Sequence, residues 1–308
     1  MINLFRISIL ILLFGLTTSC KDEKKAEDNQ IANPMQDPNL TYNDYTADPA
    51  DLIISRSEYA DKLYGFWLAQ CIANWTGLVT EMDKVGNIGE TKTGDFYTRE
   101  DWGKPDQPSI WGKGVPSDLS PTIDFVFKDT DEIWGADDDT DIEYIYQSIL
   151  DENNTSVVTP EQIRDGWLTH IKHEEQNYLW VSNETALHLM IDGLLPPNTS
   201  LPENNKHFDQ IDAQLTTEIF GLFAPARPDV ALKMAHLPIR TTAYQEAEWI
   251  AEFYVVMHSM APRTDPELGK GEQVMWLAEQ ARGRLPNESY PAKMYDFIKQ
   301  EYENNPDK

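Results

Sequence analysis

The sequence is poor in basic residues and has almost no cysteine. It contains 25 lysines and arginines against 52 aspartates and glutamates, so its formal net charge is -27. A chain this acidic repels the phosphates of nucleic acids and anionic lipid headgroups, which excludes nucleic acid as a partner. Its two cysteines are Cys20 and Cys71. Cys20 lies in the leader segment, so we expect no disulfide within one chain and a buried, small apolar role for Cys71.

Long apolar runs are also lacking, apart from one at the N-terminus. Arg6 precedes an apolar run over residues 7–16 that is too short for a stable membrane span. Small residues follow the run, which is typical of a secretory signal peptide over residues 1–19.

The segment after this run predicts lipidation. Residues 16–20, LTTSC, resemble a bacterial lipobox, in which Cys20 becomes the lipidated first residue; an ordinary cleaved signal peptide is the alternative. Residues 20–54 are charged and lack a period, as in a solvated tether. Lys21, Asp22 and Glu23 resemble the acidic export signal of Bacteroidetes surface lipoproteins. We therefore expect an extracytoplasmic protein at the outer membrane or cell surface, held by its lipid anchor only.

Alternating strand patterns longer than four residues are absent, and helical periods dominate. Residues 59–77 are apolar almost all round, which predicts a central buried helix in which Gly65 permits a close approach. Apolar residues from Ile142 to Leu150 recur at helical spacing, and Pro and Gly punctuate later segments. These segments are 161–172, 183–195, 208–223, 229–237, 243–261, 271–282 and 290–303. The sequence predicts a compact all-α domain over residues 55–308, with a long loop over 86–134.

An acidic run, WGADDDTDIEYIY, opens the helix near residue 140. It places Asp137, Asp138, Asp139 and Asp141 together. An N-cap at Asp139 or Thr140 and the helix dipole account for about 1 kcal/mol each, which leaves a surplus of negative charge. Apolar flanks draw the run toward the core, where like charges repel more strongly.

A divalent cation would compensate this surplus. Carboxylate oxygens suit Mg²⁺, with Mn²⁺ or Ca²⁺ as alternatives, and we expect one or two ions. An EF-hand beginning at Asp137 fails because Ile142 and Ser148 stand where Gly and Glu are required. The pair Asp129 and Asp131 is expected to be a solvated turn.

Four segments in a fixed order resemble the ADP-ribosylglycohydrolase family. They are KLYGFWLAQCIANWTGLVTE, WGADDDTDIEYIY, VSNETALHLMIDGLL and IDAQLTTEIFGLFAPARPDVALKMAHL, and the resemblance covers roughly residues 58–303. Asp138, Asp139 and Thr140 match the end of the family's Thr-Asp-Asp-Thr metal motif, and Asp137 stands at its first position. The resemblance implies Mg²⁺ ligation by residues 137–140, with Asp138 also in the catalytic group.

The same resemblance implies further site residues. Glu81 stands four residues after Gly77, where the family has a mobile active-site glutamate. Asn183, with Thr185 behind it, stands where the family's Gly-Asn-Gly block lines the ribose pocket. Independently of the resemblance, Gln214 lies one helical turn from Glu218 and is a candidate substrate-binding residue.

Three departures from the family pattern bear on activity. Asn74 replaces an aspartate before the first-helix glycine, and a histidine common in the family is missing from IRTTAYQEAEW. The family's second metal motif, near the C-terminus, has no counterpart after Glu267. The domain is therefore expected to be either a C-terminally incomplete fragment of a longer protein or a degenerate member of the family, with weak metal binding and little turnover.

The expected function is Mg²⁺-dependent hydrolysis of a glycosidic bond to ribose, in a small-molecule or protein-linked ribosyl substrate. The alternative is a non-catalytic lipoprotein that binds glycans or nucleosides at the cell surface. Trp102 and Trp111 lie in the long loop and are the candidates for stacking on sugar rings. His170 and His173 are expected to be surface histidines.

Overall fold

A computed structural model describes most of the chain after residue 45. The described residues are 46, 48–49, 51–110, 119–135, 137–172 and 177–305. Cys20, Trp111 and His173, three residues singled out above, lie outside them. The chain divides into two units, Met1–Pro34 and Met35–Lys308, and every described residue belongs to the second.

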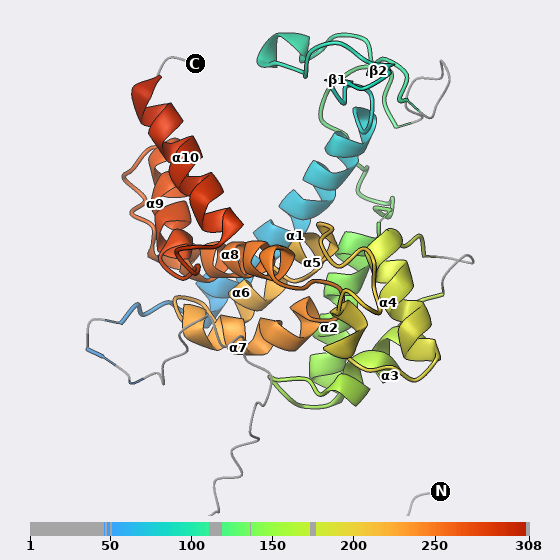
Figure 1. The fold of residues 1–308 in the computed structure, drawn as a ribbon. Helices are drawn as coiled ribbons and strands as arrows, with labels where there is room; N and C mark the ends of the chain where they lie inside the picture. Colours follow the sequence, from blue (N-terminus) through green and yellow to red (C-terminus); the bar gives the residue numbers. More distant parts are fainter. Residues whose placement is uncertain are drawn as a thin grey trace, which may run out of the picture. The chain divides into compact units, whose positions relative to one another are not determined.

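The described residues are predominantly helical, as the sequence predicts (Figure 1). The α-helices are α1 (Arg56–Val79), α2 (Asp138–Glu152), α3 (Pro160–His170), α4 (Val181–Ile191), α5 (Asp212–Thr216), α6 (Ile219–Phe223), α7 (Pro228–Ile239), α8 (Glu246–Met260), α9 (Lys270–Arg282) and α10 (Tyr290–Asn304). Short 3-10 turns lie at η1 (Arg99–Asp101), η2 (Asn198–Ser200) and η3 (Ala261–Arg263). All nine segments with a helical period overlap these α-helices, because period and chain breakers together define them.

The long loop contains the β-structure of the described residues. Strands β1 (Asn87–Ile88) and β2 (Thr91–Lys92) form a two-residue antiparallel hairpin in which Ile88 pairs with Thr91. An isolated bridge joins Pro105 to Thr122. Strands this short leave no alternation to detect in the sequence.

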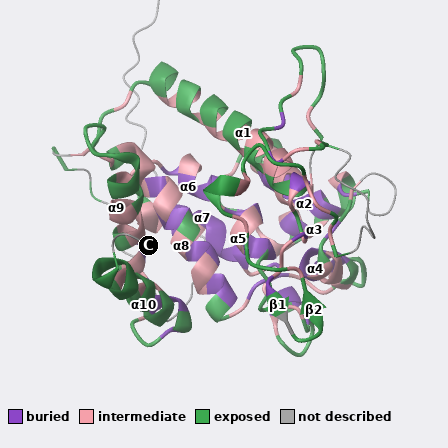
Figure 2. Ribbon diagram, turned by 90° about the horizontal axis from the view of Figure 1, so that it is seen from above, coloured by how far each residue is buried: buried purple, intermediate pink, exposed green. Residues whose placement is uncertain are grey.

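The core lies among α2 to α8. Helix α8 packs against α5, α6, α7 and α9, while α2 packs against α3 and α5. Figure 2 shows buried residues concentrated on α2, α7 and α8, with α1 and α10 largely exposed. The largest fully buried side chains include Trp167, Tyr146 and Phe220, whose burial supplies about 2–3 kcal/mol each.

Helix α2 carries the acidic run into this core. Its apolar residues Ile142, Ile145, Tyr146 and Ile149 are all buried, at the spacing that one helical face requires. The polar first turn is therefore held at the edge of the core by the packing of the three turns that follow.

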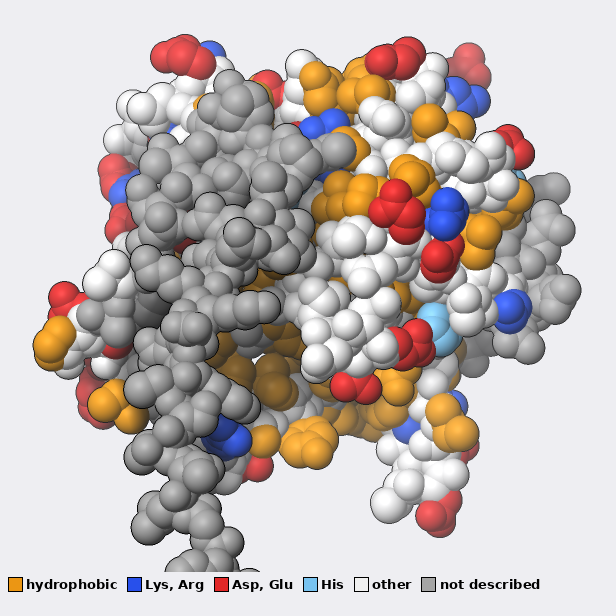
Figure 3. Space-filling view, turned by 90° about the horizontal axis from the view of Figure 1, so that it is seen from below, with side chains coloured by type: hydrophobic (Ala, Val, Ile, Leu, Met, Phe, Trp, Pro, Cys, Tyr) orange, Lys and Arg blue, Asp and Glu red, His pale blue; other side chains and the backbone are white. Residues whose placement is uncertain are grey.

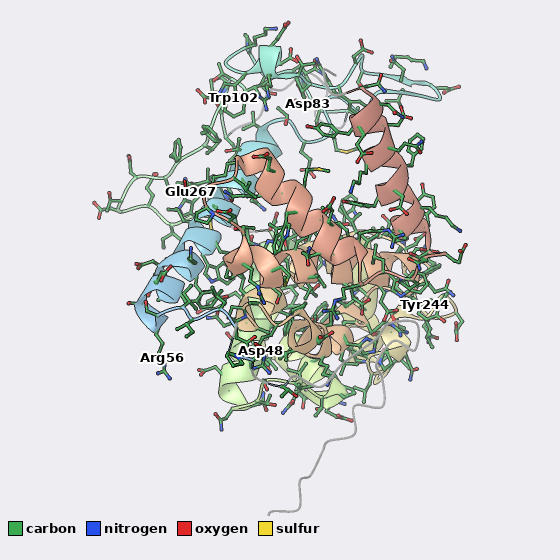
Figure 4. The ribbon with its side chains drawn as sticks, turned by 90° about the vertical axis from the view of Figure 1, so that its left-hand side faces the viewer. Asp48, Arg56, Asp83, Trp102, Tyr244 and Glu267 are labelled. Atoms are coloured by element: carbon green, nitrogen blue, oxygen red, sulfur yellow. The ribbon has the colours of Figure 1, made fainter. Side chains whose placement is uncertain are left out.

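Helix α1 forms where the sequence predicts a helix, but the prediction of a buried helix is wrong. Val79 is its single buried residue, Tyr64 is 75% exposed, and no atom comes within 4 Å of a methyl group placed on Gly65. Figure 4 shows Arg56 and Asp83 at opposite ends of this helix. Its apolar character is spread around the axis, so hydrophobicity alone could not indicate which face would be covered.

Acidic side chains are spread over the face drawn in Figure 3, in line with the excess of acidic residues. None of the helices in the described part of the chain combines the length and the apolar character that crossing a bilayer would need.

Candidate functional site

The first turn of α2 forms the nucleus of the candidate site. Asp137 caps the helix: its Oδ1 accepts a hydrogen bond from the backbone N–H of Thr140 at 3.1 Å, and its Oδ2 accepts one from Asn74 of α1. The cap therefore lies two or three residues before the predicted Asp139 or Thr140, since the helix begins at Asp138. One aspartate is explained by capping, and the remainder of the run is not.

Asp138 is buried, with 7% of its surface exposed. Its Oδ2 accepts a hydrogen bond from the backbone N–H of Trp180 at 2.6 Å and another from the Asn183 side chain at 2.9 Å. These donors come from the start of α4, so two predicted site residues, Asp138 and Asn183, are in direct contact.

Asp139 has the most perturbed titration in this turn. Burial raises its pKa to about 9, and the charges of Asp137, Asp138, Glu218 and Asp212 add to the increase. A carboxyl group with this pKa is protonated at neutral pH unless a cation compensates the surrounding negative charge.

Two acidic residues from α5 and the turn after it complete the group. Asp212 Oδ1 accepts a hydrogen bond from the backbone N–H of Asn183 at 2.9 Å, and burial raises the pKa of Asp212. Burial also raises the pKa of Glu218 to about 7. We call Asp137, Asp138, Asp139, Asp212 and Glu218 the α2 acid cluster.

Another buried carboxyl group of α2 accepts hydrogen bonds from residues of α1 and α6. Glu143 is fully buried and one turn after Asp139; its Oε1 accepts a hydrogen bond from Ile219 N at 3.0 Å, and its Oε2 accepts one from Gln70. Burial and the charge of Glu218 hold its pKa well above the usual range. Both oxygens have donors, so Glu143 anchors α1 and α6 to α2.

Unpaired oxygens gather around the acid cluster. Five buried side-chain oxygens in this part of the described structure have no hydrogen-bond donor: Gln70 Oε1, Asn74 Oδ1, Asn183 Oδ1, Asp212 Oδ2 and Glu218 Oε2. All five are acceptors, and each belongs to a residue of the cluster or to one hydrogen-bonded to the cluster or to Glu143. Leaving a buried acceptor unpaired costs about 1–3 kcal/mol, and a cation satisfies acceptors where another acceptor cannot.

The structure distributes the other predicted residues differently. Thr140 is half-buried beside its cap residue. Thr185 Oγ1 donates to Val181 O of its own helix at 2.7 Å, so that hydroxyl proton is committed to the backbone. Gln214 is half-buried on α5, two residues after Asp212. Glu81 is exposed in the turn after α1, and it is not among the carboxylates that raise the Asp139 pKa.

Sequence reasoning missed part of this site. Asp212 was not identified, because a lone aspartate at the start of a short helix carries no motif. The visible signal was its place in IDAQLTTE, two residues before Gln214 and six before Glu218. Glu143 and Gln70 were missed for the same reason: each is polar within an apolar period, a pattern that indicates a buried polar group only in retrospect.

A second cluster lies between α7 and α8. His236, Glu248 and Glu252 are at most 3% exposed, and each offers one ligand atom within 4.8 Å of the others. This group could hold a metal ion, and within the described residues it is the one set of three or more His, Cys, Asp or Glu side chains that meets this criterion. No local pattern in the sequence indicates this cluster, because its histidine is twelve residues from the nearer glutamate.

Exposed aromatic rings contact one another in the long loop, in which Figure 4 labels Trp102. Trp102, Phe125 and Phe127 are 48%, 56% and 64% exposed. The ring centroids of Trp102 and Phe125 are 4.9 Å apart, and those of Phe125 and Phe127 are 5.8 Å apart. By contrast, Trp75 contacts Trp134 and donates its indole N–H to Gly135 O, so it holds the segment before α2 against α1.

Comparison of the chain with models of protein families, with curated proteins and with solved structures finds no match to any of them.

Proposed function

We propose that the chain binds a hard divalent cation, Mg²⁺ in the first instance, at the α2 acid cluster. We further propose that this site hydrolyses a glycosidic bond to ribose, in a small molecule or in a ribosylated protein. The observation that carries the proposal is the convergence of three elements, the first turn of α2, the start of α4 and α5, on one group of buried and half-buried acids and buried unpaired acceptor oxygens.

The donor set fits a hard cation. The cluster and its neighbours offer carboxylate and amide oxygens. Mg²⁺, Mn²⁺ and Ca²⁺ prefer such ligands. In the metal-free protein, the cluster reduces its repulsion by retaining protons, as the raised pKa of Asp139 indicates. Metal binding would displace those protons.

The chemistry follows from the residues that surround the cluster. When bound, a hard dication supplies an anchor for the vicinal hydroxyls of a ribose and polarises a water molecule. Asp138 and Asp139 hold the negative charge that retains the ion. Asn183 is fixed by Asp138 and keeps its own Oδ1 available, as a group that lines a sugar pocket requires.

Glu218 is the carboxyl group best suited to moving a proton here. Its pKa of about 7 lets it give or accept a proton near neutral pH, and its Oε2 has no donor among the described residues. Glu81, the glutamate that the family resemblance implies, is exposed at the end of α1. We therefore propose Glu218 as the proton-transfer group of this chain.

Binding and turnover test the proposal together. Mg²⁺ should raise the melting temperature of the chain, and free ADP-ribose should bind in the presence of Mg²⁺ and not of EDTA. Release of ribosyl product from ADP-ribosylated peptides should be seen by chromatography and should disappear in Asp138→Asn. Asp151→Asn, an exposed aspartate on the same helix, is the matched control. Mg²⁺-indifferent stability and no ADP-ribose binding would reject the proposal.

A second candidate function rests on the exposed aromatic rings. Trp102, Phe125 and Phe127 form a surface on which a sugar ring could stack, as in a glycan-binding lipoprotein. Binding to a glycan array that persists in EDTA and is lost in Trp102→Ala would favour this function. Binding that requires Mg²⁺ and survives Trp102→Ala would count against it.

We also propose that the chain is exported and anchored by a lipid on Cys20. The support is the sequence of the leader alone, with its apolar run and lipobox-like end. Metabolic labelling with a radioactive fatty acid in a Gram-negative host tests it, since the label should be lost in Cys20→Ser. Equal labelling of both chains would overturn it.

A further inference from the structure

The cluster between α7 and α8 joins two neighbouring buried helices. Figures 1 and 2 show α7 beside α8, with buried residues on both, and the two helices pack against each other. Glu248 and Glu252 are four residues apart on α8, so they share one face of the helix. His236 of α7 faces them: its Nδ1 is 3.5 Å from Glu248 Oε1.

The distance between the imidazole and the carboxylate is informative. A charge-assisted hydrogen bond between these groups is typically about 2.7–2.9 Å long. Two ligands of one tetrahedral ion, each about 2.0–2.1 Å from it, are roughly 3.4 Å apart. The observed 3.5 Å is long for a direct ion pair and close to the separation of two ligands that share a metal.

The negative charge of the two buried glutamates also favours a bound metal ion. Burying two carboxylates costs several kcal/mol each unless positive charge compensates them. Arg240 supplies one such charge: its Nε is 3.7 Å from Glu248 Oε2, donates to Ser200 Oγ at 3.1 Å, and its guanidinium lies over the Tyr244 ring. Glu248 thus presents one oxygen to Arg240 and the other to His236, the arrangement of a monodentate ligand whose second oxygen is held by a neighbouring residue.

We propose that His236, Glu248 and Glu252 form a buried structural site for a transition-metal dication, and that the ion is Zn²⁺. One imidazole nitrogen with two carboxylate oxygens suits Zn²⁺ better than Mg²⁺, and the order of affinities among first-row metals favours Zn²⁺ over Mn²⁺ and Fe²⁺. The site is chemically distinct from the α2 acid cluster, which offers oxygen ligands. Its role is to clamp α7 to α8.

Metal analysis of the tag-free chain tests the site. Protein purified from zinc-supplemented medium and desalted should contain about one zinc ion per chain, measured by mass spectrometry of metals. Zinc should be lost in His236→Gln and Glu252→Gln, and retained in His188→Gln, an exposed histidine of α4. It should also be retained in Asp138→Asn, which separates this site from the α2 acid cluster.

A spectroscopic measurement keeps the test independent of how the variants fold. Metal-depleted wild-type protein should take up Co²⁺ with the intense visible absorption of a tetrahedral site, and Zn²⁺ should abolish that absorption whereas excess Mg²⁺ should not. A folded wild-type protein without zinc and without this Co²⁺ absorption would overturn the proposal. It would leave a protonated His236 as the group that neutralises the glutamates. Equal zinc content in wild type and a folded His236→Gln would overturn it as well.

Discussion

Replacing Asp139 with asparagine removes a carboxyl group that stays protonated in the metal-free folded protein, which lowers the free energy of unfolding. An unperturbed aspartate titrates near 3.8, whereas Asp139 titrates at about 9. At pH 7 the unfolded chain has released this proton and the folded chain retains it. Proton linkage changes the free energy of unfolding by 1.36 kcal/mol per pH unit, and roughly three units separate 3.8 from 7. The retained proton therefore lowers the free energy of unfolding by about 4 kcal/mol.

The sign of the effect follows from the same pKa values. Because burial and neighbouring acids raise the pKa of folded Asp139, this group favours the folded state least at high pH. The stability of the metal-free protein should therefore fall as the pH rises from about 4 to about 9. Asparagine has no such titration, so Asp139→Asn should stabilise the metal-free protein at pH 7 by up to about 4 kcal/mol, which in a domain of this size raises Tm on the order of 10 °C.

Thermal unfolding with and without metal is the assay. In EDTA at pH 7, Asp139→Asn should melt above wild type; with saturating Mg²⁺ the wild type should gain about 3 kcal/mol at 100 times its Kd, while the variant gains little. Asp151→Asn, on the exposed face of α2, should change neither result. A lower Tm for Asp139→Asn in EDTA would refute the reasoning, because it would mean that the carboxylate is stabilising as it stands.

Three further predictions concern other parts of the molecule. Gly221→Ala should lower the free energy of unfolding by about 1–3 kcal/mol in denaturant titrations, because a methyl group there meets His258 Cβ at 2.7 Å and the backbone of Val255; wild-type stability would contradict the close packing of α6 on α8. Glu218→Gln should abolish ribosyl release in a product assay while Mg²⁺ still raises Tm; unchanged turnover would exclude Glu218 as the proton-transfer group. Burial, with a side-chain hydrogen bond to Asp106, raises the pKa of Asp83 to about 6. Stability should therefore fall as the pH rises from 4 to 6, and Asp83→Asn should flatten this part of a Tm-against-pH curve; an unchanged slope would count against the shift.

The helical segments were accessible from the sequence because their information is local. Helix α2 combines an acidic start with four apolar residues at helical spacing, and α3 begins with Thr159 and Gln162, whose side chains form a capping box around Pro160. Such signals lie within a few residues of each other, so they identify a helix without its neighbours.

Whether a helix is buried depends on the elements that pack against it, and the sequence indicated this packing less well than it indicated the helices. The apolar composition of α1 predicts a buried helix, yet Tyr64 and Leu68 are exposed. Its contacts are specific ones at wide sequence separation: Tyr59 donates to Leu222 O, Gln70 to Glu143 and Asn74 to Asp137. A single sequence contains no sign of such pairings, because each depends on the path of the chain between the two residues.

The candidate site likewise has one part that local sequence indicates and another part that comes together only through folding. Asp137, Asp138 and Asp139 are adjacent and could be recognised from their repulsion alone. Asp212 and Glu218 join them only through folding, across more than seventy residues of chain, and their role becomes visible in the raised pKa of Asp139. Likewise, His236 meets Glu248 and Glu252 only because α7 and α8 pack against each other.

The most direct test of the account is to locate a bound ion. Crystals of the chain grown with Mn²⁺, which takes the same oxygen ligands as Mg²⁺, would reveal the ion by anomalous scattering. The account predicts an anomalous peak within about 2.3 Å of carboxylate oxygens of Asp138 or Asp139. Ordered crystals in saturating Mn²⁺ with no peak among these residues would contradict it.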